Sequence, residues 1–80
     1  FLFPYPVEGG FWMKNTFIPL SIAFWNAEGR IVDTLDMQPC EADPCPLYTP
    51  QEVYVGAVEA SLGYFDAQGV NIGDLTELKR

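Results

Sequence analysis

The stretch that decides the fold is LSIAFWNAEGRIVDTLDM, residues 20–37. Large and small side chains alternate along residues 20–25, as in a strand with one well-filled face. Residues 26–29, Asn-Ala-Glu-Gly, are typical of a type I turn that ends in a left-handed glycine. Residues 30–37 supply the return strand. The stretch therefore predicts an antiparallel hairpin with a bulged three-residue loop.

Two signals in this hairpin disagree about its register. The bulged turn places Phe24 opposite Val32, and it places Ala23 opposite Asp33. Hydrophobic patterning alone prefers a slip of one residue, which would gather the large apolar side chains of both strands on one face. We follow the turn, because a two-residue Ala-Glu loop would force positive φ on residues that disfavour it. Each face is then mixed, which favours a small, strongly curved sheet or barrel-like domain covered on both sides.

The rest of the chain predicts more short strands and one helix, and so an α+β fold class that is mostly antiparallel. A short helix near the C-terminus is predicted over residues 62–68, and Gly69 is its expected left-handed end. Its apolar residues Leu62, Tyr64 and Phe65 are expected to face the sheet. The further strands are predicted at residues 1–3, 11–13, 53–59 and 75–78, the first of them stopped by Pro4 and Pro6.

Composition limits the size and the chemistry of the protein. The 80 residues, 49% of them apolar and 15% aromatic, predict a single domain over residues 1–80 with a real core. Apolar runs stay far below the roughly 20 residues that a membrane-spanning helix needs. A net charge of −7 with four basic residues excludes a phosphate-tracking surface, so no nucleic-acid partner is expected. Without histidine, the His-dependent nucleophile systems and common zinc sites are absent, and neither cofactor nor metal is predicted.

The two cysteines lie in PCEADPCP, residues 39–46, where three prolines make a stiff loop. Cys40 and Cys45 can form a disulfide, remain as thiols, or serve as a metal or redox pair. Two thiolates without histidine leave a tetrahedral site half empty, so the metal is the weakest of these. A small domain usually needs a covalent staple, which favours the disulfide and with it an oxidising compartment.

A resemblance to a known family begins at FWMKNTFIPL, residues 11–20, and continues through residues 22–24 and the return at residues 29–32. With residues 43–48, residues 60–69 and Gly73-Asp74, the chain resembles the family called domain of unknown function 192. The resemblance implies a small β-rich α+β or barrel-like domain without an established activity. It also implies an extracytoplasmic location (periplasmic, cell envelope or secreted), often behind a signal sequence or a membrane anchor. Relative to that family, the chain is expected to lack an N-terminal segment.

One candidate site is a cluster of hydrogen-bonding side chains next to an aromatic. Lys14, Asn15 and Thr16 follow Trp12 closely. Lys14 could hold an anionic group, the two neighbours could bind hydroxyls, and Trp12 could form an apolar wall. The alternative is that the polar side chains only satisfy the backbone of a turn.

A second candidate is an aromatic platform beside a carboxylate. In the register set by the turn, Trp25 and Asp33 share a face, which is typical of a sugar site. The same arrangement also fits an edge aromatic that covers a neighbouring strand.

Carboxylates give the alternative of catalysis. Most of the 11 acidic residues are expected to form a solvated surface, no spacing fixes a pair, and no catalytic residue is predicted. The sequence therefore favours a non-catalytic module that binds a small molecule or a partner protein; the alternative is a carboxylate-dependent hydrolase or transferase, for example on carbohydrate. The carboxylates available to it are Asp33, Asp36, Glu41, Asp43 and Glu52.

The apolar start Phe1-Leu2-Phe3 predicts an edge strand whose phenylalanines are covered. Phe1 and Phe3 are expected to be buried, either inside the monomer or at a symmetric contact. A homodimer through this edge and proximity to a membrane through a removed N-terminal anchor are the expected associations.

Overall fold

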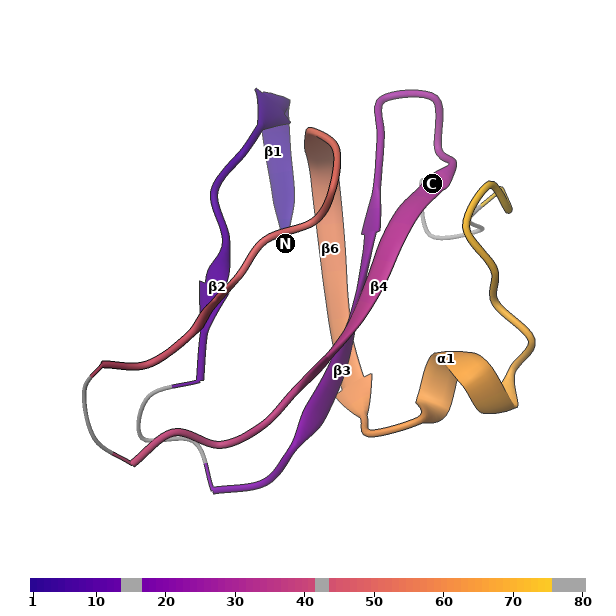
Figure 1. The fold of residues 1–80 in the computed structure, drawn as a ribbon. Helices are drawn as coiled ribbons and strands as arrows, with labels where there is room; N and C mark the ends of the chain where they lie inside the picture. Colours follow the sequence, from indigo (N-terminus) through magenta and orange to yellow (C-terminus); the bar gives the residue numbers. More distant parts are fainter. Residues whose placement is uncertain (14–16, 42–43, 76–80) are drawn as a thin grey trace.

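A computed structural model describes residues 1–13, 17–41 and 44–75 of the chain. Its centre is a four-stranded antiparallel sheet with the order β1-β6-β3-β4 (Figure 1). The bounds of these strands are Leu2–Val7 for β1, Leu20–Trp25 for β3, Ile31–Met37 for β4 and Tyr54–Ser61 for β6. A second, two-stranded antiparallel sheet pairs β2 (Phe11–Trp12) with β5 (Leu47–Tyr48) and is called the ribbon below.

The predicted fold class is confirmed in its main features, with one correction. The strands are antiparallel, and α1 (Tyr64–Ala67) is the one helix in the part of the chain that the structure describes. Within the same part of the chain the sheet is open, with β1 and β4 as its edges, so the predicted barrel-like closure is not observed. Three layers result, because the ribbon lies on one side of the sheet and α1 on the other (Figure 1).

The turn of the central hairpin forms as predicted. Gly29 has a φ of 81°, a left-handed value that glycine adopts without a steric cost. The amide of Gly29 donates a 2.9 Å hydrogen bond to the carbonyl of Asn26. Next to the turn, Trp25 pairs with Ile31.

Beyond the turn the predicted register is wrong. Phe24 pairs with Asp33 and Ala23 pairs with Thr34, with an irregularity of one residue between Phe24 and Trp25. The extra residue is Val32, so β4 contains a β-bulge. The bulge satisfies both signals: the turn keeps its geometry, while Leu20, Ile22 and Phe24 still share a face with Leu35 and Met37.

Each face of the sheet has its own apolar cluster. The face toward the ribbon is closed by aromatic contacts, with the Phe24 and Tyr54 ring centroids 4.7 Å apart and those of Phe11 and Phe24 5.8 Å apart. The buried members of this cluster are Met13, Ile22, Phe24, Val32, Met37, Tyr54 and Ala57. The buried members of the cluster on the opposite face are Ala23, Trp25, Ile31 and Phe65.

The first strand differs from its prediction. It runs through Pro4 and Pro6 instead of ending there, because an edge strand tolerates residues that lack an amide donor. Phe3 is half-buried and packs against the core, with its ring centroid 5.8 Å from that of Tyr54. Phe1 is 62% exposed, so its expected burial inside the monomer is wrong, and it contacts Phe11 at a centroid distance of 5.0 Å. A homodimer through this edge stays a prediction.

The disulfide between Cys40 and Cys45 is present, as predicted, with the two Cα atoms 5.7 Å apart. The amide of Cys40 donates a 3.2 Å hydrogen bond to the carbonyl of Met13, which ties the loop to the end of β2. Disulfides persist in oxidising environments, so this bridge is typical of a protein outside the cytoplasm. None of the described helical residues form a segment long and apolar enough to span a bilayer.

Candidate functional site

The face of the sheet that carries Trp25 is covered by residues 62–75, which we call the strap. The strap contains α1, which is shorter than the predicted helix over residues 62–68. Gly63 precedes α1 with a φ of 83°, and Gly69 ends it with a φ of 73°, as predicted for Gly69. A left-handed residue directly before the helix reverses the chain out of β6, so the strap returns along the sheet.

Ser21 on β3 anchors the start of the strap. Its side chain is 3% exposed, and its hydroxyl donates a 2.8 Å hydrogen bond to a carboxylate oxygen of Asp36 on β4. The same hydroxyl accepts a 2.9 Å hydrogen bond from the amide of Gly63. One buried hydroxyl therefore joins two strands of the sheet to the point where the strap begins.

The end of the strap is anchored to the start of β4. The amide of Ile31 donates to the carbonyl of Asp74 at 2.8 Å, and the amide of Gly73 donates to the carbonyl of Ile31 at 2.7 Å. The Arg30 guanidinium adds a 3.0 Å hydrogen bond to the carbonyl of Gly73. These bonds cover part of the outer edge of β4, and they attach the C-terminal end of the strap to the sheet.

Between the anchors the strap touches the sheet mainly through Phe65. This is the buried side chain of α1, and it packs against the cluster that contains Ala23 and Trp25. The expected orientation toward the sheet is thus confirmed for Phe65. Leu62 and Tyr64 are about half exposed: α1 begins only at Tyr64, so Leu62 precedes it, and Phe65 is the buried residue of its single turn.

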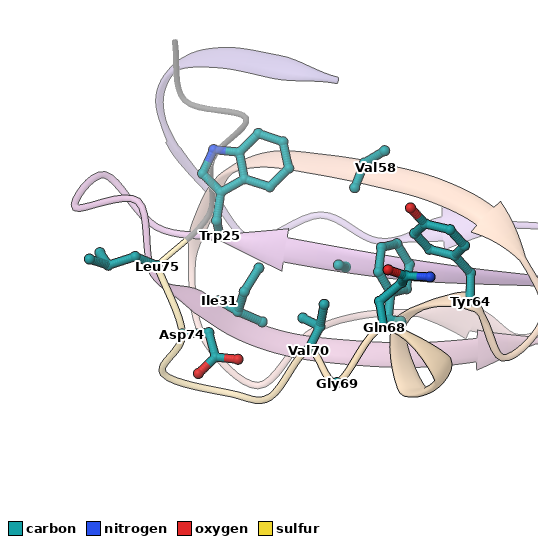
Figure 2. Close-up of a pocket in the computed structure, with 11 residues that line it drawn as sticks. Trp25, Ile31, Val58, Tyr64, Gln68, Gly69, Val70, Asp74 and Leu75 are labelled. Carbon is teal, nitrogen blue, oxygen red and sulfur yellow. The ribbon is translucent and has the colours of Figure 1, made fainter.

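A pocket of about 460 Å³ lies between the strap and the sheet. Figure 2 shows its residues, which come from β3, β4, β6 and the strap. The volume is within the range of small-molecule sites, about 300–1,000 Å³. The lining residues are Ala23, Trp25, Ile31, Val58, Tyr64, Phe65, Gln68, Gly69, Val70, Asp74 and Leu75.

Polar side chains stand at the two ends of this pocket, and an apolar floor separates them. In Figure 2 the hydroxyl of Tyr64 and the amide of Gln68 lie at one end, and the carboxylate of Asp74 lies at the other. One oxygen of Asp74 accepts a 2.8 Å hydrogen bond from the amide of Asn71. Within the described part of the chain, neither the Tyr64 hydroxyl nor the Gln68 side chain has a hydrogen-bond partner, so both are available to a ligand.

Trp25 forms a wall of the pocket, and its position depends on Gly56. The two residues are cross-strand partners, and a Cβ atom on Gly56 would overlap the indole ring. Trp25 is thereby packed into the sheet, with 5% of its surface exposed. The ring is a rigid apolar surface, fixed before any ligand arrives.

A smaller hollow of about 190 Å³ adjoins the pocket, sharing Phe65 and Val70 with it. Two carboxylates line the hollow, Asp36 and Asp66. Asp36 is engaged by Ser21, as described above. Over the described residues, no group of three or more His, Cys, Asp or Glu side chains is placed to hold a metal ion.

The structure separates the predicted site residues. Trp25 lines the pocket. Asp33 pairs with Phe24, the neighbour of Trp25 in β3, so the Asp33 side chain projects from the opposite face of the sheet. The expected shared face of Trp25 and Asp33 is thus wrong, and the bulge at Val32 is the cause. Trp12 is 62% exposed on the ribbon, away from the pocket lining.

The rest of the first candidate cluster, Lys14, Asn15 and Thr16, lies outside the described residues. Its proposed role as a ligand site stays a prediction.

Asp33 has a structural role in the loop before β6. Its carboxylate accepts hydrogen bonds from the amides of Thr34 at 2.9 Å and Gln51 at 3.0 Å. The Gln51 side chain returns a 3.1 Å hydrogen bond to the carbonyl of Val32. Among the other carboxylates offered for catalysis, Glu41 and Glu52 are exposed, and Asp43 lies outside the described residues.

Most of the pocket residues could not be predicted from the sequence, although two features of the predicted helix indicated part of it. Phe65 and Tyr64 were expected at the sheet, and Gly69 was expected to end the helix. Nothing in the spacing of Gln68 or Asp74 shows that the strap bends back toward β4, because the hydrogen bonds that fix it join residues distant in sequence.

Comparison with known families gives one match. The sequence model of the family described as DUF192, Uncharacterized ACR, matches residues 1–78. No curated protein and no solved structure matches the chain. Since the match extends over nearly the whole sequence, the chain belongs to the DUF192 family.

Proposed function

We propose that the protein is a non-catalytic, extracytoplasmic binding module whose ligand site is the pocket under the strap. The observation that carries this proposal is the pocket itself, about 460 Å³ in volume and built from a packed sheet face and a strap tied at both ends. A site that is formed before the ligand arrives avoids the entropic cost of ordering its walls on binding.

The lining favours a small organic molecule over a macromolecule. Aromatic and branched apolar side chains make the floor and walls, and a few polar groups stand at the ends. This combination is typical of small-molecule sites, in which apolar contact supplies affinity and a few hydrogen bonds set orientation. The strap covers one side of the pocket, so a ligand would be enclosed between the strap and the sheet.

Binding is favoured over carboxylate catalysis because the described lining of the pocket contains too few acidic side chains. Glycoside hydrolysis by the common mechanism uses two carboxyl groups that flank the scissile bond. Of the described residues that line the pocket, Asp74 alone carries a carboxylate. In the part of the chain that the structure describes, the lining therefore lacks the pair that a hydrolase of this type needs.

The disulfide supports the extracytoplasmic part of the proposal. A bridge between Cys40 and Cys45 is stable where the environment is oxidising, as in the periplasm, the cell envelope or the extracellular medium. The proposal places the protein in one of these compartments.

A fragment screen observed by protein NMR tests the proposed function. We expect small aromatic or cyclic fragments to shift the resonances of Trp25, Tyr64 and Val70. The substitution Val58→Phe fills the pocket from β6 and should abolish these shifts. Its control is Val53→Phe, the same change at an exposed position outside the pocket, which should leave them intact.

Two results would count against this proposal. Fragments that bind equally well to the Val58→Phe variant occupy another site. Turnover of a generic ester, glycoside or phosphate substrate that a single carboxylate substitution abolishes would make the protein an enzyme.

A further inference from the structure

The charge distribution around the pocket is one-sided. Asp74 lines the pocket, and Asp36 and Asp66 line the hollow that adjoins it through Phe65 and Val70. No basic side chain appears among the lining residues of either space. From the described residues, an anionic ligand would therefore meet only negative charge and neutral groups inside the pocket.

The basic side chain next to pocket residue Ile31 in the sequence binds the backbone of the strap instead of lining the pocket. Arg30, the one basic side chain among the described residues, donates a 3.0 Å hydrogen bond to the carbonyl of Gly73 and does not line the pocket. One carboxylate oxygen of Asp74 accepts the amide of Asn71, and no described residue donates to the other. The Asp74 carboxylate thus keeps an acceptor for a ligand.

The aromatic walls, like Asp74, favour a positively charged ligand. The face of an aromatic ring attracts a cation through its quadrupole, and Trp is the strongest of the aromatic side chains in this respect. In Figure 2 Trp25 and Asp74 both lie toward the end of the pocket that is remote from Tyr64 and Gln68, with Ile31 between them. This end of the pocket presents an aromatic ring and a carboxylate, while the other end presents a hydroxyl and an amide.

We infer that the ligand is an organic cation with an apolar body, whose ammonium group is bound by the Asp74 carboxylate at the end of the pocket that Trp25 also lines. Its apolar body lies on the floor formed by Ile31, Val58 and Val70, and a hydrogen-bonding group at its far end reaches Tyr64 and Gln68. This inference rests on the proposed function of the pocket and adds the chemical class of the ligand.

Three probes of similar shape but different charge test the inference. Tyramine carries an ammonium group, 4-ethylphenol is its neutral counterpart, and 3-(4-hydroxyphenyl)propionate is anionic. We expect tyramine to bind about fivefold to tenfold more tightly than 4-ethylphenol, as a partly exposed ion contact allows. The propionate should bind most weakly. Dissociation constants come from NMR titrations that follow the pocket resonances.

Two variants that each remove one negative charge distinguish a direct contact with Asp74 from the overall negative electrostatic potential of the protein. Asp74→Asn keeps the shape of the side chain and an acceptor for the Asn71 amide. It should lower the affinity for tyramine to that for 4-ethylphenol. Glu28→Gln changes the net charge by the same amount, and Glu28 lies outside the pocket lining, on the exposed hairpin turn. It should leave all three affinities unchanged.

The outcomes distinguish this inference from the proposed function. If the three probes bind equally and Val58→Phe removes them all, the pocket binds small molecules but the cation preference is wrong. If tyramine fails to bind while other fragments occupy the pocket, the inference is again overturned and the proposed function remains. If Glu28→Gln weakens tyramine as much as Asp74→Asn does, the assignment of the ammonium to Asp74 is wrong.

Discussion

The indole ring of Trp25 occupies the space that a side chain on Gly56 would take. The two residues are direct cross-strand partners on β3 and β6, at the centre of the sheet. A glycine in a strand interior costs backbone entropy and often marks a close approach of another group. Here the approaching group is the aromatic wall of the pocket, so Gly56 positions the site without contributing a side chain to it.

A methyl group at position 56 should displace that wall. Gly56→Ala is expected to lower the free energy of unfolding by about 1–3 kcal/mol, because overpacking forces the ring or the strand to move. Urea unfolding gives this value, and the resonance of the Trp25 indole N–H reports the movement of the ring. Gly9→Ala is the control, because a Cβ at Gly9 meets nothing within 4 Å. Equal stability of the two variants would contradict the packing described.

The anchor at Ser21 leads to a prediction about the strap. Ser21→Ala leaves the amide of Gly63 and the carboxylate of Asp36 without their shared partner. We expect a loss of about 1–3 kcal/mol and faster amide hydrogen exchange along residues 62–75.

The matched control for that variant is Ser61→Ala, at an exposed position at the end of β6. Exchange that rises equally throughout the sheet, rather than in the strap, would show that Ser21 supports the whole core instead of anchoring one segment.

Tyr54 leads to a prediction about alkaline pH. Its hydroxyl donates a 2.7 Å hydrogen bond to the carbonyl of Gly9, and burial raises its pKa above the ordinary value. The folded state therefore disfavours the phenolate. Stability is unaffected below the unfolded-state pKa of about 10 and falls as the pH rises above it.

The variant Tyr54→Phe should remove part of that alkaline loss, at a cost of about 1 kcal/mol at neutral pH from the missing hydrogen bond. Urea unfolding at a series of pH values measures both effects. Tyr5→Phe, at an exposed position, should change neither. An unchanged alkaline slope in the Tyr54→Phe variant would contradict the assignment.

The disulfide closes a short ring, so its effect on stability is expected to be modest. Cys40 and Cys45 are five residues apart, for which the chain-entropy relation gives about 2 kcal/mol. Reduction of the native protein should lower the free energy of unfolding by about this amount without unfolding it. The double variant Cys40→Ser/Cys45→Ser should be equally destabilised and insensitive to the reductant. Two alkylatable thiols in freshly isolated protein would contradict the bridge.

Local signals in the sequence account for the parts of the fold that were predicted. The turn before Arg30 was predictable because its geometry depends on four consecutive residues and on the left-handed Gly29. The disulfide was predictable because a stiff loop brings Cys40 and Cys45 together whatever the rest of the chain does.

The register and the pocket depend on contacts that sequence spacing does not reveal. The bulge at Val32 reconciles a turn rule with an apolar pattern, and the turn rule alone gives the wrong partner for Phe24. The strap contains a helix of only four residues, too short for a periodic pattern, and its anchors at Ser21 and Ile31 are distant in sequence. Trp25 could be singled out as an aromatic, but its true neighbours could not.

The most direct test of the pocket is a crystal structure of the protein with the tightest-binding fragment from the NMR screen. We expect the fragment to lie between the sheet and the strap, against Trp25 and Val58, with a polar group toward Asp74 or Tyr64. A fragment bound instead at Trp12 on the ribbon, or along the outer edge of β1, with the pocket under the strap empty, would contradict it.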